Sequence, residues 1–357
     1  MVRFEEAIPH GGMSLKPLLK SMIETEGPLP VSTYMTLCLH HPEFGYYARG
    51  GGIGRDFTTA PELSQVFGEL LGLWAVNTWR GMDAPTPFTL AEWGGGRGTL
   101  MRDARRAAAL APDFMAAHQL HMLDASPALL GRQVSALETD LVAAHSGLSE
   151  LPHDPLILIA NELLDCLPAR AFSRSGGQWH EKLVGLTDDG ELGFGLSDAP
   201  NIDVETTSVE DEIEVQPGFE ALVAALAARP QPFHALFVDY GPSSSAPADT
   251  LRGYKDGAQV DPLAIPGDAD LTVDVDFGRL ARLARQVGLE VAGPLPQGLF
   301  LGALGIETRM RQLIAENPEK APDIHQGVAT LVEPDKMGER FKVICLSSAG
   351  LPSPAGF

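Results

Sequence analysis

The stretch FTLAEWGGGRGTLM, residues 88–101, decides the fold. A short apolar run ends in an acid, Glu92, and is followed by the five residues GGGRG (94–98). From Thr99 onward the residues are typical of a helix. This order predicts a strand, a glycine turn and a helix. Because glycine has no Cβ, such a turn lets backbone N–H groups at the start of the helix approach a ligand closely.

Outward from this stretch, strand patterns and helix patterns alternate along the chain. We expect strands at 88–92, 119–124, 140–145, 155–160, 234–239, 289–292 and 341–347. We expect helices at 14–26, 30–40, 62–80, 99–110, 127–137, 218–228, 276–287 and 300–316. The run PLILIA (155–160) is nearly all apolar, as in a strand that is buried on both faces. Such alternation predicts an α/β fold with a doubly wound parallel sheet and ligands at the carboxyl ends of its strands.

Two regions depart from the alternation. Residues 168–200 carry short alternating runs around Gly-Gly and Asp-Gly pairs, which predict β-hairpins. Residues 241–274 are rich in Pro, Ser, Asp and Gly and read as a long irregular segment. A loop of that length in a compact domain is usually functional or disordered.

Bulk composition limits the choice of partners and compartment. The 357 residues contain 26 Lys and Arg against 47 Asp and Glu, a formal net charge of −21. A surface of this sign repels nucleic acid and suits a basic protein partner, although solubility or a salt-adapted host explains it equally well. The three cysteines (Cys38, Cys166, Cys345) are far apart, so we expect a reducing compartment and no metal site. We also expect no signal peptide, no membrane span and a cytoplasmic location.

Polar residues fall at the ends of four expected strands: Glu92, Asp124, Asn161 and Asp239. The carboxyl ends of parallel strands meet at one edge of the sheet, so these side chains are expected to gather around one nucleoside-binding site. Asp124 is suited to accept hydrogen bonds from ribose hydroxyls. The same acid would suit NAD. Alternatively, Asp124 precedes a helix for which Ser126 is the N-cap and Pro127 the first residue.

At this point the sequence resembles the MidA-type S-adenosylmethionine-dependent methyltransferases, whose mitochondrial member assists respiratory complex I assembly and is implicated in arginine methylation of one subunit. The matching strings span most of the chain in the same order. They are RDFTTAPELSQVFGELLG (55–72), EWGGGRGTLMRD (92–103), NELLDCLPARAF (161–172), VDYG (238–241), TLRGYK (250–255), PGDADLTVDVDF (266–277), QGLFLGALGIETR (297–309) and MGERFKVI (337–344).

The resemblance implies a Rossmann-like class I methyltransferase fold in four segments. Residues 1–80 would form an N-terminal helical segment with a lid loop, and 81–167 the first part of the methyltransferase core. Residues 168–217 would form a β-rich insertion, and 218–357 the second part of the core with the long loop 241–274.

The cofactor implied by the resemblance is S-adenosylmethionine. Backbone N–H groups of the glycine turn would meet its carboxylate, Glu92 would bind its amino group directly or through water, and Asp124 would bind its ribose. The residues expected to bind it are Glu92, Gly94, Gly96, Gly98, Thr99, Asp124, Ser126, Thr59, Pro61 and Glu62. The last three belong to the segment 54–69, which is either a lid over the cofactor or an N-capping arrangement in which Thr59 or Ser64 precedes acids.

The methyl acceptor is expected beside the loop that follows strand 155–160. Glu162 and Asp165 lie three residues apart, so both carboxylates could face one guanidinium and bind it. We expect Glu162, then Asn161, then Asp165 to act in catalysis. The alternative is a polar start of a helix whose acids only cap exposed N–H groups. Tyr240 either lines the acceptor pocket or is an ordinary aromatic residue at a strand end with its hydroxyl in water.

The chain departs from the family pattern at several positions. The family usually has Pro at Gly95, Leu at Trp93 and Gly at Arg55, and it usually carries histidines near Gly257 and Asp274. These departures leave open an alternative in which the chain is a catalytically inactive assembly or binding factor. A second alternative is an NAD-type oxidoreductase, although the turn lacks the G-x-G-x-x-G spacing. The resemblance implies a protein acceptor such as a respiratory subunit. The sequence leaves the oligomeric state open, a homodimer included.

Overall fold

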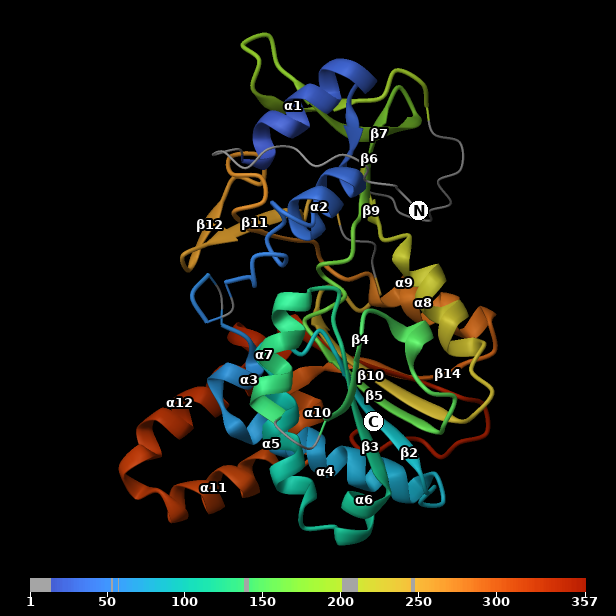
Figure 1. Ribbon diagram of the computed structural model, residues 1–357, viewed down its shortest axis with the longest axis vertical. Helices are drawn as coiled ribbons and strands as arrows, with labels where there is room; N and C mark the ends of the chain where they lie inside the picture. Colours follow the sequence, from blue (N-terminus) through green and yellow to red (C-terminus); the bar gives the residue numbers. More distant parts are fainter. Residues whose placement is uncertain (1–13, 53, 57, 138–140, 201–210, 245–247) are drawn as a thin grey trace.

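The computed structural model describes residues 14–52, 54–56, 58–137, 141–200, 211–244 and 248–357 (Figure 1). Its centre is a seven-stranded sheet in the order β14-β15-β10-β5-β2-β3-β4. The bounds are β2 Phe88–Trp93, β3 His118–Leu123, β4 Leu141–His145, β5 Leu156–Asn161, β10 Phe233–Tyr240, β14 Glu290–Pro296 and β15 Phe341–Ser347. Strands β10, β5, β2, β3 and β4 are parallel, and β15 and β14 complete the sheet with antiparallel pairings. The predicted α/β fold is confirmed.

Both faces of this sheet are buried, as the apolar run of β5 predicts. Leu156 and Leu158 belong to the hydrophobic core on one face, whereas Ile157 and Ile159 belong to the core on the other. Each core is closed by helices. The first face packs against α8 Gly218–Ala227 and α9 Phe277–Gln286. The second packs against α4 Gln65–Gly81, α5 Thr99–Ala108, α6 Pro112–Ala117, α10 Gln297–Ala303, α11 Ile306–Glu316 and α12 Ala321–Val332, and takes in the end of α7 Pro127–Leu137.

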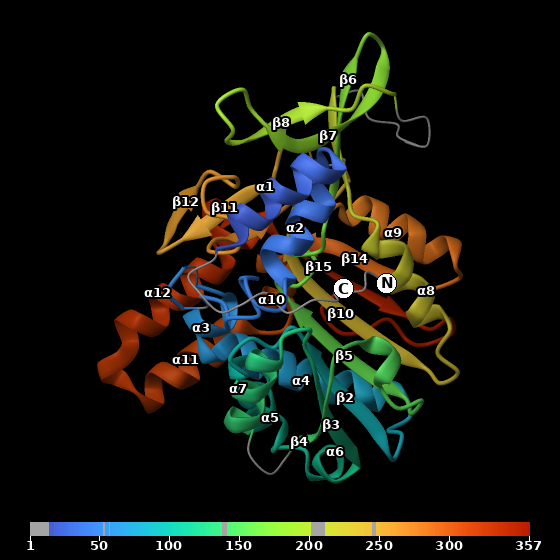
Figure 2. The same cartoon turned by 45° about the horizontal axis from the view of Figure 1, so that its top comes forward.

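The N-terminal helices and the β-rich insertion share a separate hydrophobic core above the sheet (Figure 2). The core takes residues from α1 Leu15–Glu26, β1 Leu29–Pro30, α2 Val31–His40, β6 Arg170–Ser175, β7 Gln178–Leu186 and β8 Leu192–Leu196, and from Leu251, Leu263, Leu271 and Val273. Strand β9 Glu212–Val215 extends the sheet by pairing with β6. The hairpins predicted for 168–200 are β6–β7 and β7–β8. Strand β1 pairs with β7, with Leu29 opposite Val184. This pairing joins the two regions that sequence reasoning treated as separate segments.

The prediction of a long irregular segment at 241–274 is wrong in part. Three short strands form a sheet there: β11 Arg252–Lys255, β12 Ala258–Val260 and β13 Asp270–Thr272. Strands β11 and β12 are joined by Asp256 and Gly257, which have φ values of 48° and 73°. Asp-Gly favours such a two-residue hairpin turn because both positions need positive φ. Residues 245–247 of this segment lie outside the described part.

The expected helices 62–80 and 300–316 are each divided. The first begins as a short helix, α3 Ala60–Leu63, and restarts at Gln65, where the Ser64 hydroxyl accepts a hydrogen bond from the N–H of Val66. The second divides between α10 and α11 at Gly305, which has a φ of 88°. The sequence prediction missed helices α6 and α12. The remaining short turns are η2 Leu148–Glu150, η3 Pro318–Lys320 and η4 Pro334–Gly338.

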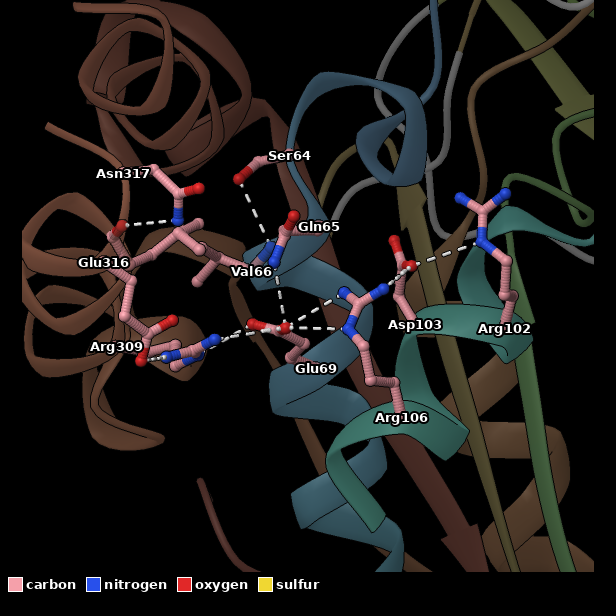
Figure 3. A network of polar contacts seen from close by, with 11 residues as sticks. Ser64, Gln65, Val66, Glu69, Arg102, Asp103, Arg106, Arg309, Glu316 and Asn317 are labelled. Atoms are coloured by element: carbon pink, nitrogen blue, oxygen red, sulfur yellow. Dashed lines mark hydrogen bonds and ion pairs between the residues drawn. The ribbon is translucent and has the colours of Figure 1, made fainter. Parts of the chain in front are cut away.

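A buried carboxylate holds three of the helices together (Figure 3). Glu69 of α4 accepts hydrogen bonds from Arg106 of α5 (2.9 Å) and from Arg309 of α11 (2.8 Å). Helices α4 and α5 approach closely because α4 carries glycine at the crossing: a Cβ on Gly72 would lie 2.0 Å from the carbonyl oxygen of Ala104. Since α3 leads into α4 and the glycine turn leads into α5, this cluster fixes two segments that border the site.

Among the residues that the structure describes, none of the helices combines the length and apolarity needed to cross a bilayer. The same residues contain no cluster of three or more His, Cys, Asp or Glu side chains that could hold a metal ion.

Candidate active site

A cavity of about 230 Å³ opens at the carboxyl ends of β2, β3 and β5, where the four polar strand ends were expected to meet. We call it the donor cavity. Its lining includes most of the residues predicted to bind a cofactor: Thr59, Pro61, Glu62, Glu92, Gly94, Gly96, Thr99, Asp124 and Ser126. Two residues predicted to act in catalysis, Asn161 and Glu162, line it as well. Sequence reasoning missed other members of the lining, among them His40, Tyr47, Ser146 and Cys166.

The glycine turn follows β2 as predicted. Gly94, Gly96 and Gly98 have φ values of 75°, 52° and 78°, a region that residues with a Cβ rarely adopt. The N–H of Gly98 donates to the carbonyl of Gly95 (2.7 Å), and Gly98 is the N-cap of α5. Gly98 is absent from the cavity lining, so it shapes the turn and does not face the cavity.

Glu92 is buried beneath the turn with a carboxylate oxygen that lacks a partner. The residue is 3 % exposed, and its Oε2 forms no hydrogen bond within the described structure. Burial raises the pKa of Glu92 to about 8, and the nearby Asp124 carboxylate adds to this rise. A Cβ on Gly95 would lie 3.1 Å from the Glu92 carboxyl carbon and 2.4 Å from the Met122 methyl, so the glycine leaves room beside the acid.

Asp124 and Ser126 combine the two interpretations that the sequence left open. The Ser126 hydroxyl accepts a hydrogen bond from the N–H of Leu129 (3.2 Å), so Ser126 caps α7. Asp124 accepts from the N–H of Ser126 (2.9 Å) and from the amide of Gln133 (2.8 Å). Both residues nevertheless line the donor cavity, and burial raises the pKa of Asp124. Capping and ligand contact are therefore compatible at this strand end.

The short helix α3, before α4, lines the cavity and forms hydrogen bonds with the loop after β5 and with the start of α5. The N–H of Ala60 donates to Glu162 Oε1 (3.1 Å), and the Thr99 hydroxyl donates to Glu62 (2.6 Å). Arg97 of the glycine turn approaches the same Glu62 carboxylate at 3.6 Å. Thr59 and Pro61 also line the cavity, so α3 and the residue before it form one of its walls.

The loop after β5 is held in an unusual conformation. Glu162 has a φ of 52°, uncommon for a residue with a side chain. The fully buried Asp239 of β10 accepts hydrogen bonds from the N–H groups of Leu163 (3.1 Å), Leu164 (2.8 Å) and Asp165 (3.3 Å). Asp239 lines neither cavity described here. Burial raises the pKa of Glu162 to about 7, and the Asp165 carboxylate adds to this rise.

A second cavity, of about 240 Å³, adjoins the donor cavity. Three residues line both: Tyr47, Glu162 and Cys166. The second cavity is also lined by Thr58, Asp165, Tyr240, Tyr254, Asp270, Thr272, Arg340 and Phe341. Asp165, placed by sequence reasoning beside Glu162, belongs only to this cavity, and Tyr240 lines it too.

The departures from the family pattern have local structural partners. Arg55 donates to both carboxylate oxygens of the buried Asp56, which also accepts from the Tyr46 hydroxyl. Gly257 supplies the positive φ of the β11–β12 turn. Asp274 binds Arg340 through both carboxylate oxygens.

Comparison with known proteins agrees with this geometry. A model of a family of S-adenosyl-L-methionine-dependent methyltransferases matches residues 70–295. A Drosophila melanogaster protein named "Protein arginine methyltransferase NDUFAF7 homolog, mitochondrial" is 36 % identical, over 94 % of this chain and 85 % of that protein. The human protein arginine methyltransferase NDUFAF7, mitochondrial, is 32 % identical over 92 % of this chain and 83 % of its own length.

A solved structure shares the whole architecture. The crystal structure of a COG1565 superfamily member from Burkholderia thailandensis, bound to S-adenosyl-homocysteine, superposes with a TM-score of 0.82 at 25 % identity. The match covers 95 % of this chain and 92 % of that chain.

Two expectations from the sequence change with these findings. The cytoplasmic location is contradicted, because the relatives are named mitochondrial. Scattered free cysteines indicate a reducing environment, but they do not distinguish the cytoplasm from other reducing compartments. The oxidoreductase alternative is also wrong, because the matching family transfers methyl groups. The chain belongs to the family of S-adenosyl-L-methionine-dependent methyltransferases, with S-adenosylmethionine as its cofactor.

Proposed function

We propose that this methyltransferase modifies arginine side chains of a protein, with the cofactor in the donor cavity and the arginine in the second cavity. The observation that carries the proposal is the wall that the two cavities share. Tyr47, Glu162 and Cys166 line both, so a donor and an acceptor placed on either side of them would be neighbours. Alignment of two reactants at such a boundary is the main requirement of a displacement reaction.

The residues of the donor cavity suit the cofactor. Glu92 has a buried oxygen without a partner, which could accept a hydrogen bond from an ammonium group. The N–H groups of the glycine turn would bind the carboxylate, and Asp124 the ribose hydroxyls. Thr59, Pro61, Glu62, Thr99 and Ser126 would enclose the remainder. When bound, S-adenosylmethionine supplies a methyl group on a positively charged sulfur, and the lid segment would exclude water from it.

An arginine acceptor is supported by the carboxylates beside the shared wall and by the names of the relatives. Glu162 would hold one edge of the guanidinium and orient the nitrogen that attacks, with Asn161 fixing the Glu162 carboxylate through a hydrogen bond of 3.0 Å. Asp165 would bind farther from the donor. The sequence resemblance extends the proposal to a subunit of a respiratory complex as the natural acceptor.

A radiolabel experiment tests the proposal. The purified protein is incubated with methyl-tritiated S-adenosylmethionine and a library of peptides that each contain one arginine between random neighbours. We expect methylarginine after acid hydrolysis, and none with a matched library in which lysine replaces arginine. Label in methyl-lysine, or in no amino acid, would reject the arginine acceptor. Purified respiratory subunits in place of the peptides then test the narrower part of the proposal.

A further inference from the structure

Three carboxylates line the second cavity: Glu162, Asp165 and Asp270. The sequence predicted the first two as site residues but not Asp270. Glu162 lies at the wall shared with the donor cavity. Asp165 and Asp270 belong to the second cavity alone and are 4 % and 3 % exposed. Asp270 is the first residue of β13, about a hundred positions from Asp165 in the sequence.

These carboxylates have neutral partners only. The Tyr240 hydroxyl donates to Asp165 Oδ2 (2.7 Å), and the Tyr47 hydroxyl donates to Asp270 Oδ1 (2.9 Å). Asp165 Oδ1 is buried and has no hydrogen-bond partner within the described part of the chain. No ion pair joins Glu162, Asp165 or Asp270 to any described lysine or arginine. A buried acid with an empty acceptor position is costly unless something fills that position.

The only described cation of the lining is already neutralised. Arg340 binds Asp274 through both carboxylate oxygens, and its guanidinium lies 5.2 Å from the centre of the Tyr240 ring. Its side chain is 52 % exposed, so it borders the cavity from the solvent side. Arg340 therefore does not compensate the three acids. Burial raises the pKa of Asp165, and burial together with the nearby Asp165 carboxylate raises the pKa of Asp270.

A planar cation with many donors suits this arrangement. A guanidinium has five N–H groups directed outward in one plane and is more weakly hydrated than an ammonium group. It can reach carboxylates on more than one side at once. An ammonium has three donors around one point and loses more hydration on burial.

Resting on the proposed function, we propose that Asp270, held by Tyr47, is a specificity-determining residue of the acceptor site. Asp270 and Asp165 bind the guanidinium edge that points away from the donor, and Glu162 binds the edge that points toward it. Tyr47 aligns Asp270 from the shared wall. The site thereby selects a delocalised cation over a neutral or ammonium side chain, and Asp270 contributes to binding and not to the methyl transfer itself.

The test uses a small probe that separates binding from methylation. Ethylguanidinium chloride is titrated calorimetrically into the full protein saturated with S-adenosylhomocysteine, with ethylurea as the neutral probe of the same shape and ethylammonium as the second cation. We expect saturable binding of ethylguanidinium, at least tenfold weaker binding of the other two, and at least tenfold weaker ethylguanidinium binding by Asp270→Asn. The exposed Asp188→Asn variant, with the same charge change, should bind as the parent does.

A second variant guards against misfolding. Tyr47→Phe keeps every charge and removes the hydroxyl that holds Asp270, so cation binding should weaken several-fold. An unchanged far-ultraviolet circular dichroism spectrum and an unchanged midpoint of urea denaturation in both variants show that the fold is intact. Equal binding of ethylurea and ethylguanidinium, absence of saturable ethylguanidinium binding, or parental binding by an intact Asp270→Asn variant would each overturn the inference. Cation binding without methylarginine formation would leave the inference standing and remove the proposed function.

Discussion

The donor and second cavities adjoin each other but are assembled differently. The donor cavity lies on the ends of neighbouring parallel strands, and each strand carries its polar residue in the same stretch of sequence as its turn. The second cavity takes residues from the loop before α3, the loop after β5, the end of β10, the start of β13 and the start of β15. The donor half of the site, formed by the donor cavity, therefore has a base set by local backbone geometry, and its walls at Tyr47 and α3 come from distant segments. The acceptor half, formed by the second cavity, depends throughout on how distant segments pack.

The largest effect is expected at the wall that both halves share. Glu162→Gln removes the charge that would orient the acceptor and should lower kcat by about 10³-fold, the size of effect found for electrostatic groups at reacting centres. The affinity for S-adenosylhomocysteine should change by less than about threefold, because Glu92 and Asp124 provide the main polar contacts of the donor. Single-turnover kinetics and calorimetry measure the two values. Glu290→Gln, on the surface, is the matched control. A loss confined to cofactor affinity would place Glu162 in the donor half only.

The next effect isolates the donor half. Asp124→Ala should weaken S-adenosylhomocysteine binding by about 100-fold, because a charged acceptor of two ribose hydroxyls is lost. Ethylguanidinium binding should not change, since Asp124 does not line the second cavity. Calorimetry measures both ligands, and Asp113→Ala, exposed on α6, is the control. If both affinities fell together, the two cavities would not be independent.

A smaller effect tests whether the helices behind the donor half need their buried ion cluster. Glu69→Ala leaves Arg106 and Arg309 without their shared carboxylate. Because both arginines can still reach water, we expect a loss of about 2 kcal/mol in the free energy of unfolding, below the range for fully buried pairs. Urea denaturation measures it. Glu316→Ala removes an exposed partner of Arg309 and should cost less than about 0.5 kcal/mol. Equal losses in the two variants would show that burial at Glu69 is unimportant.

The smallest effect is the pH dependence of S-adenosylhomocysteine affinity, which concerns the donor half. Burial raises the pKa of Glu92 to about 8, so at pH 6.5 the ligand-free protein holds this acid mainly protonated. An ammonium ligand binds the ionised form better, so affinity for S-adenosylhomocysteine should rise from pH 6.5 to 8, by at most about tenfold per pH unit. Calorimetry across this range measures the slope. Glu92→Gln should bind weakly at every pH and lose the slope; a slope that persists would assign it to Asp124 or Glu162.

Sequence reasoning succeeded where structure is local. The apolar strands, the glycine turn and the acids that follow the strands are all contained in short stretches, so Glu92, Asp124 and Glu162 could be placed before the fold was known. Tyr47 and Asp270 could not, because each looks ordinary in its own stretch and acquires neighbours only through packing. Asp270 lies in one of the strings that match the family, PGDADLTVDVDF (266–277), whereas Tyr47 lies in none of them. The division of the helix expected at 300–316 shows a related limit, because Gly305 is a tolerable helix residue until its positive φ is seen.

Asp239 holds the backbone of the site without lining either cavity. It touches neither cavity, yet its carboxylate fixes three consecutive N–H groups of the loop that carries Glu162 and Asp165. Residues that line a cavity can therefore differ from the family pattern, as Gly95 illustrates, while the loop keeps its conformation. The converse also holds. A substitution of Asp239 would displace the loop and so prevent substrate binding, although every residue that contacts the substrate would be unchanged in sequence. A member of this family can therefore lose activity through a substitution at a residue that does not contact the substrate.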